Sequence, residues 1–154
     1  MTGVGGSTEM AFDRRDVIST LARATAAELA EALCSLGEPE GWRWLRPPET
    51  GLIMVRGRVG GGGGPFNLGE ATVTRASVVL QTGETGHAYA LGRDRDAAGH
   101  AALLDGLWQT AAREGVEESV LRPVRQRILA EEARAEGEAA ATTASFFTLV
   151  RGEG

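Results

Sequence analysis

Four polar residues of one predicted strand have side chains that could bind a phosphate or phosphonate group: Glu70, Thr72, Thr74 and Arg75. Alternation along a strand places Thr72 and Thr74 on one face, with Glu70 in line if the strand starts that early, whereas Arg75 points to the other face. An arginine with neighbouring hydroxyls can hold such an anion through charge-assisted hydrogen bonds. Threonine is common in strands, however, and Arg75 also suits a solvent-facing position, so the pattern by itself favours a structural role.

A second charged group, Arg93-Asp94-Arg95-Asp96, lies between a predicted strand and a predicted helix, where functional residues often gather. The same residues also suit a helix cap within a solvated charge cluster, and the pattern by itself favours this interpretation. If the chain contacts a substrate, we expect Arg75 and Arg93 to meet the phosphate charge. Glu70 and Thr72 would then orient polar groups.

The glycine run at positions 60–64 does not form a phosphate-binding loop by its spacing. Starting from Gly60, the sixth position holds Pro65 instead of the required glycine, and a strand follows where a helix is needed. The run is typical of a flexible hairpin connection. A mobile loop beside a ligand stays open as an alternative, because glycine allows a close backbone approach.

The sequence lacks the residues that lysine-dependent, metal-dependent or nucleophilic catalysis would require. All 16 basic residues are arginine, which excludes Schiff-base lysines and phosphate-loop lysines. His87 and His100 have no third ligand at a metal spacing, so we expect no bound metal or cofactor. Cys34 is the only cysteine and falls in an apolar stretch of its helix, which predicts a core position. Since no nucleophile or paired-carboxylate motif stands out, catalysis by this chain alone is not indicated.

Composition narrows the class of protein. With 42% hydrophobic and 24% charged residues, the 154-residue chain has the make-up of one globular domain. A formal net charge of −5 argues against nucleic acid as a partner, because phosphate neutralisation needs a cationic surface. No stretch reaches the roughly 20 apolar residues of a membrane span, so we expect no membrane partner. The single cysteine fits a reducing, cytoplasmic setting. Residues 1–12 are expected to be a disordered leader, followed by a single domain over 13–154.

The elements that position these residues predict an α+β fold, with a small, mainly antiparallel sheet packed with helices. Capping signals and helical spacing predict a helical pair over residues 14–36. Turn-like links between successive β patterns predict antiparallel pairing. The strands are expected at residues 42–46, 52–58, 71–81 and 87–91, and further helices at 97–113 and 122–137.

The C-terminal segment carries half of the four phenylalanines, directly after a polar helix. One interpretation is a last strand that completes the sheet of the protein itself. The other is a strand-like arm that docks on another subunit, with the charged helix as its support. The residues proposed for such docking are Phe146, Phe147, Leu149 and Arg151.

An ordered set of motifs resembles the PhnG family, the G subunit of the bacterial carbon–phosphorus lyase system. The resemblance extends from about Val17 to Gly152. Its motifs are Glu49-Thr50-Gly51-Leu52, Gly69-Glu70-Ala71-Thr72-Val73-Thr74-Arg75, Gly92-Arg93-Asp94 and Phe146-Phe147-Thr148-Leu149-Val150-Arg151-Gly152. The chain departs from the family pattern where Thr143-Ala144-Ser145 replaces Arg-Val-Asp, which implies a local change if those residues meet a partner.

The resemblance implies an accessory and assembly role in phosphonate catabolism. The family acts with the H, I and L subunits to transfer the ribose triphosphate part of MgATP to methylphosphonate, with release of adenine. MgATP is then a substrate of the complex, the I subunit is the most direct partner, and the J subunit joins a larger core. Two alternatives stay open: a self-sufficient enzyme on a phosphorylated sugar or nucleotide, and a stand-alone homodimeric anion-binding module.

Overall fold

The computed structural model describes residues 11–58 and 64–151, and its first elements are two short helices with side-chain caps. Helix α1 (Arg14–Ala22) begins after Asp13, whose carboxylate accepts from the backbone N–H of Asp16 while the Asp16 carboxylate accepts from that of Asp13. Helix α2 (Ala26–Leu36) begins after Thr25 with the same reciprocal box, closed by Glu28, and ends at Gly37 with φ of +83°. Each box satisfies N–H groups that the first helical turn leaves unpaired. The predicted helical pair over residues 14–36 is confirmed.

Three antiparallel strands form a sheet in the order β1-β2-β3. Strand β1 (Arg43–Arg58) pairs with β2 (Pro65–Val79), and β2 pairs with β3 (Thr85–Leu91). The predicted strands 42–46 and 52–58 are therefore one strand, and the prolines expected to separate them lie within it. β1 is an edge strand with register shifts on both sides of Arg46, and such irregularities accommodate residues that cannot donate a ladder hydrogen bond.

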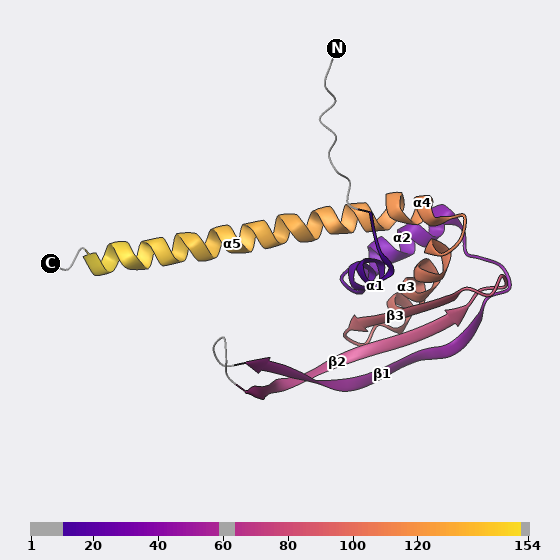
Figure 1. Cartoon of the computed structure of the whole chain (residues 1–154), viewed down its shortest axis with the longest axis horizontal. Helices are drawn as coiled ribbons and strands as arrows, with labels where there is room; N and C mark the ends of the chain where they lie inside the picture. Colours follow the sequence, from indigo (N-terminus) through magenta and orange to yellow (C-terminus); the bar gives the residue numbers. More distant parts are fainter. Residues whose placement is uncertain (1–10, 59–63, 152–154) are drawn as a thin grey trace, which may run out of the picture.

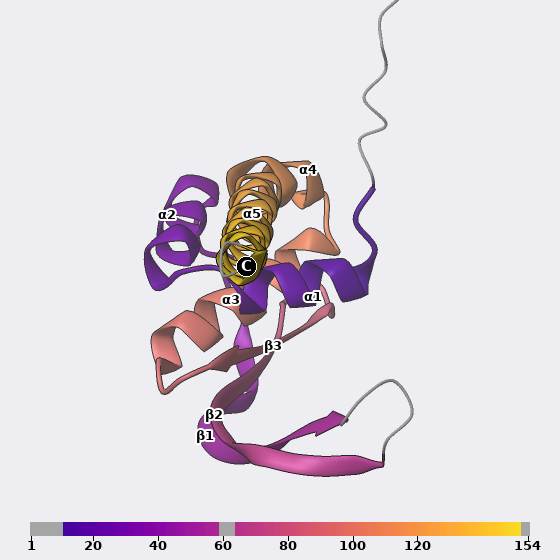
Figure 2. The ribbon, with the colours of Figure 1, turned by 90° about the vertical axis from the view of Figure 1, so that its left-hand side faces the viewer.

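The helices cover one face of this sheet (Figures 1 and 2). Helix α3 (Arg95–Trp108) is capped by Asp94, a member of the charged group that was expected to suit a helix cap, and packs against β3 and β2. It comes so close that a Cβ on Gly86 would meet the carbonyl oxygen of Ala102 at 1.9 Å. Glycine at this position is thus a condition for the contact between β3 and α3. The α+β class is confirmed.

The chain after α3 differs from the prediction in two ways. Helix α3 ends at Trp108, not at residue 113, and a short helix α4 (Arg113–Val116) leads into a π-helical turn, η1 (Glu117–Leu121). Helix α5 (Arg122–Arg151) then continues well past the expected end at residue 137. The helical backbone runs without a break from η1 into α5, so Pro123 lies inside a continuous helical run, and the carbonyl oxygen one turn before it receives no backbone N–H from this residue.

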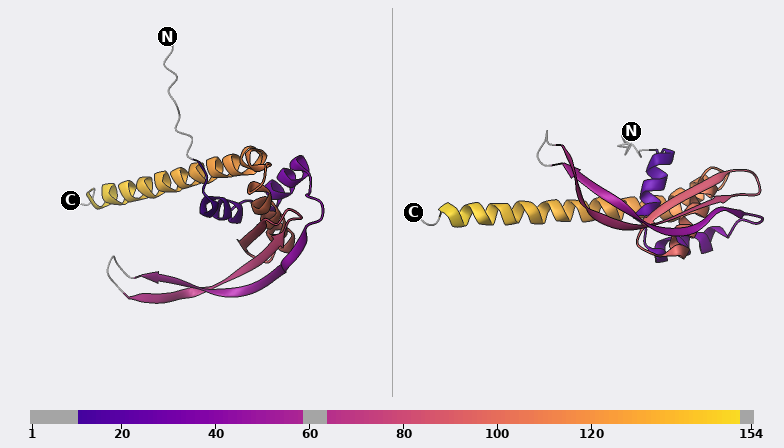
Figure 3. Two further views of the ribbon diagram at one scale, coloured as in Figure 1. Left: turned by 45° about the vertical axis from the view of Figure 1, so that its right-hand side comes forward. Right: turned by 90° about the horizontal axis from the view of Figure 1, so that it is seen from below.

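The strand expected in the C-terminal segment is wrong, because residues 145–151 are the last turns of α5. A strand needs an open ladder to pair with, and the figures show this segment far from the sheet (Figures 1 and 3). The alanine run over residues 139–141 supplies strong helix formers between the charged part of the helix and Phe146.

A buried ion pair joins three elements of the core. The Asp105 side chain of α3 has no exposed surface, and its Oδ2 accepts from Arg14 Nη2 at 2.9 Å and from the backbone N–H of His87 at 2.8 Å. Arg14 Nη2 also donates to the carbonyl oxygen of Thr85 at 2.7 Å. The carboxylate is therefore paired and hydrogen-bonded, as a buried charge must be, and it ties α1 to α3 and β3.

The first turns of α5 are held to the N-terminal helices by charged groups. Arg127 donates to Glu28 Oε1 at 2.8 Å, to Glu28 Oε2 at 3.0 Å and to Glu131 at 3.0 Å. These bonds to Arg127 lower the pKa of Glu28 below its ordinary value, and Glu28 and Glu131 in turn raise the pKa of Arg127. Arg23 of the turn between α1 and α2 adds a contact to Glu132 at 2.9 Å. The start of α5 is thereby fixed on the domain.

Two further expectations concern single residues. Cys34 is exposed, so its predicted core position is wrong. The buried face of α2 passes through Leu29, Ala32 and Leu33, and the position after Leu33 is already turned about 100° toward solvent. Phe12 of the expected leader packs against the core, with the Arg125 guanidinium 3.6 Å from its ring centroid. Residues 1–10 of that leader, and positions 60–63 of the glycine run, lie outside the described residues.

Candidate partner-binding surface

The β1–β2 hairpin extends beyond the rest of the sheet. β3 ends opposite Val73 of β2, so residues 52–58 and 65–72 form a two-stranded ribbon, here called the hairpin arm. Figures 1 and 2 show this ribbon leaving the helical part of the molecule with no helix against it. A two-stranded ribbon without a packed face is at best marginally stable in water, so the hairpin arm has the properties of a surface that a partner covers.

Apolar side chains project from both faces of the hairpin arm. Leu52 and Met54 lie on one face with exposed fractions of 63% and 55%, while Ile53 and Val55 lie on the other and are also exposed. Leu68 on β2 is exposed as well and lies over Gly57, where an added Cβ would come within 2.7 Å of it. Contiguous apolar surface of this kind marks an interaction site.

The second projecting element is the distal part of α5, residues 129–151, here called the distal helix; its first turn contacts the domain through the ion pair of Glu132 with Arg23. Every described side chain from Leu129 to Phe146 is exposed, with Phe146 at 64%. Figures 1 and 3 show it extending from the domain toward the same end of the molecule as the hairpin arm. The predicted docking residues Phe146, Phe147, Leu149 and Arg151 all belong to it. Their role in docking stays a prediction, and they would act from a helix.

The predicted phosphate contacts do not gather in one place. Glu70 and Thr72 lie on the face of the hairpin arm that carries Met54 and Leu52, their partners in the ladder. The loop with Arg93 comes near them, because the backbone N–H of Gly92 donates to the carbonyl oxygen of Thr72 at 2.8 Å.

Arg75 points from the opposite face of the sheet, as alternation predicts. Its ladder partners there are Glu49 on β1 and Tyr89 on β3. Thr74 is fully buried and its hydroxyl donates to the carbonyl oxygen of Gly92 at 2.7 Å, which is a structural role. The assignment of Arg75, Arg93, Glu70 and Thr72 to substrate contact stays a prediction.

The described residues contain neither a metal-binding cluster nor a membrane-spanning helix. In the part of the chain that the structure describes, no three His, Cys, Asp or Glu side chains are grouped so that they could hold a metal ion. Within the same residues, no helix is both long and apolar enough to cross a bilayer. What the described side chains offer is binding surface on two projecting elements.

Comparison with known proteins identifies the family. The family model for "Phosphonate metabolism protein PhnG" matches residues 12–152. The chain belongs to the PhnG family. A curated relative, the alpha-D-ribose 1-methylphosphonate 5-triphosphate synthase subunit PhnG of Rhizobium meliloti (strain 1021), is 50% identical over 140 residues, which cover 91% of this chain and 90% of the relative. The resemblance drawn from the motifs is thereby confirmed.

The search of this PhnG sequence for residues with catalytic or ligand-binding chemistry did not identify the hairpin arm. Leu52-Ile53-Met54-Val55 is an apolar run with no polar alternation, which is typical of a strand covered on both faces. In the described part of this PhnG chain, neither face of the run is covered. The run was therefore a usable signal that the strand needs an additional partner.

Proposed function

We propose that this chain is an accessory and assembly subunit of a ribose 1-methylphosphonate 5-triphosphate synthase, the enzyme of organic phosphonate catabolism named in its relative. The similarity to that relative carries the proposal, since it extends over nine tenths of both chains at 50% identity. At that level, the two chains share their fold and, by the same inference, the surfaces through which they assemble.

The partners follow from the family resemblance. The H, I and L subunits act with this chain in the cytoplasm, the I subunit is its most direct neighbour, and the J subunit joins the larger core. The complex transfers the ribose triphosphate part of MgATP to methylphosphonate and releases adenine. MgATP is a substrate of the complex rather than a cofactor of this chain.

Two features of the structure support an assembly role. The hairpin arm and the distal helix present apolar side chains that nothing in the described part of the chain covers. Burying such side chains gains roughly 25 cal/mol per Å² of apolar surface, so their natural state is a complex. Exposed apolar surface on two projecting elements is a property expected of a subunit that assembles with partners, more than of a self-sufficient enzyme.

Adenine release from MgATP in the presence of methylphosphonate tests the proposal directly. We expect none from the purified chain, and release from the H, I and L subunits together with this chain. Omission of this chain should abolish the reaction and break the association of the remaining subunits. Turnover by the chain alone would contradict the proposal, as would full activity and assembly without it.

A further inference from the structure

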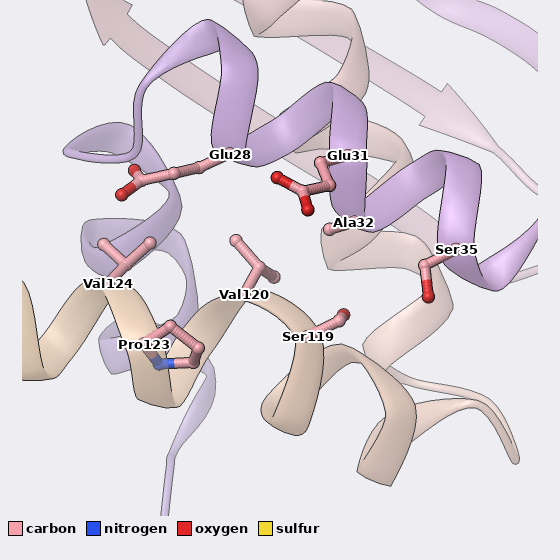
Figure 4. A pocket seen from close by; sticks show the side chains of 8 residues that line it. All are labelled: Glu28, Glu31, Ala32, Ser35, Ser119, Val120, Pro123 and Val124. Atoms are coloured by element: carbon pink, nitrogen blue, oxygen red, sulfur yellow. The ribbon is translucent and has the colours of Figure 1, made fainter.

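A groove of about 410 Å³ lies between α2 and the segment where η1 passes into α5 (Figure 4). Glu31, Ala32 and Ser35 of α2 form one wall, and Ser119, Val120 and Val124 form the other. The volume falls in the range of ordinary ligand pockets. The groove lies apart from the hairpin arm and from the distal helix, and no residue predicted for substrate or partner contact lines it.

The groove stays open because small side chains face each other across it. Ala32 and Ser35 leave space on α2, and Ser119 leaves space on the π-helical turn, a conformation often found at functional sites. The Ser119 hydroxyl is buried and has no hydrogen-bond partner among the described residues. A buried hydroxyl without a partner costs free energy, which a bound polar group could recover.

The charge in the groove is negative. Figure 4 shows Glu28 and Glu31 projecting from α2 on the side that faces the opposite wall. The Glu28 carboxylate is held at one end of the groove by Arg127, whose bonds lower the pKa of Glu28. Within the described residues Glu31 forms no hydrogen bond or ion pair, and no basic side chain lines the groove.

The floor of the groove is apolar. Ala32 of one wall and Val120 and Val124 of the other close the bottom of the groove, and each is buried to 2% exposure or less. An apolar channel beside a free carboxylate matches a side chain with an aliphatic stem and a cationic head, which buries the stem and pairs the charge.

We propose that this groove receives an arginine or lysine side chain of a partner protein, whose cationic head pairs with Glu31 while its methylenes lie in the groove between α2 and the start of α5. Residues 1–10, 59–63 and 152–154, which the structure does not describe, contain no arginine or lysine and so do not supply this cation. The proposal rests on the proposed function in one respect: the partner is taken to be a subunit that assembles with this chain.

Charge reversal in the assembled complex is the first test. In Glu31→Arg, repulsion of the incoming cation should weaken association with the H, I and L subunits by at least about tenfold. Ser35→Arg should act in the same direction, because it places a cation one turn from Glu31 and occupies the groove. Glu40→Arg is the control: it makes the same charge change at an exposed position outside the groove, and association should stay within about twofold of wild type.

The result separates the groove from the proposed function. If the wild-type chain assembles and Glu31→Arg binds the H, I and L subunits equally well, the proposal for the groove is overturned and the assembly role stays intact. A failure of the wild-type chain to assemble would overturn the proposed function. Circular dichroism on each variant shows whether the fold is retained, which we expect since residues 31, 35 and 40 are exposed.

A second test needs no partner subunit. N-acetyl-L-arginine amide, titrated into the full ¹⁵N-labelled chain, should shift amide signals of α2 and of residues 119–124. N-acetyl-L-citrulline amide, which is neutral and nearly the same shape, should produce at least about fivefold smaller shifts, and Glu31→Gln should reduce the arginine response to that level. Equal responses to both probes, or no response in the groove, would overturn the proposal.

Discussion

At the scale of single residues, the Asp105 carboxylate links α3 to α1 and β3 within the core. It is fully buried, and it accepts from Arg14 and from the His87 backbone. Asp105→Ala removes the carboxylate that accepts from Arg14 and from the His87 N–H. The free energy of unfolding should therefore fall by about 3 kcal/mol. This is the low end of the range for a broken buried ion pair, because the Arg14 side chain is 40% exposed. Asp105→Asn should cost less, because an amide oxygen still accepts from His87. Urea unfolding checks both, with Glu136→Ala as the control; this exposed substitution should change stability by less than about 0.5 kcal/mol.

Glu28 gives the protein a pH dependence that can be traced to one pair. Its pKa is lowered in the folded state, chiefly by the hydrogen bonds from Arg127, so its contribution to stability is fully present above the ordinary value of 4.5. That contribution is lost as the pH falls through the lowered pKa of the folded state. Unfolding measured from pH 6 to pH 3 should therefore show a shallower loss of stability in Glu28→Gln than in wild type. Arg127→Gln should show the same flattening, and a steeper loss in either variant would contradict the assignment.

At the scale of elements, the hairpin arm should bind without being needed for the fold. Leu52→Ser with Met54→Ser removes exposed apolar surface from one face, so the free energy of unfolding should change by less than about 1 kcal/mol in total. If this face is buried in the complex, association with the partner subunits should weaken at least about tenfold, as at interface hot spots. Leu45→Ser, on an exposed residue near the other end of β1, is the matched control. Unfolding of the double variant would show that the arm supports the domain itself.

How far the sequence predicts these elements depends on whether local signals are sufficient. Capping residues and periodicity lie within a few positions of each other, so the helices that start after Asp13, Thr25 and Asp94 could be predicted. The merging of two strands across Pro47 and Pro48 could not, because it depends on the partner strand and its register shifts. The C-terminal helix was missed since its aromatic, β-branched end has strand propensity, and only the absence of a nearby sheet edge decides against a strand.

Part of the candidate partner-binding surface could also be predicted from local sequence, and part of it could not. The family could be recognised from ordered motifs. The apolar run Leu52–Val55 is typical of a strand with two covered faces, a signal that the strand prediction for residues 52–58 did not use. The groove at Glu31 could not be foreseen, because its two walls lie about 90 residues apart in the chain. The pairing of Arg14 with Asp105 is equally distant in sequence. Contacts of this kind appear only once the helices are packed.

At the scale of the whole molecule, a domain with two projecting elements should separate folding from assembly. Removing residues 144–154 deletes the end of the distal helix, where the described side chains from 144 to 146 are exposed, so the thermal midpoint should change by no more than about 2 °C. Association with the partner subunits should weaken at least about tenfold, because Phe146 and Phe147 are lost with the segment. Removing only residues 152–154 is the control and should leave both quantities unchanged. A truncated chain that fails to fold would mean that the end of α5 stabilises the domain, and a truncated chain that assembles normally would leave the hairpin arm and the groove as the docking surfaces.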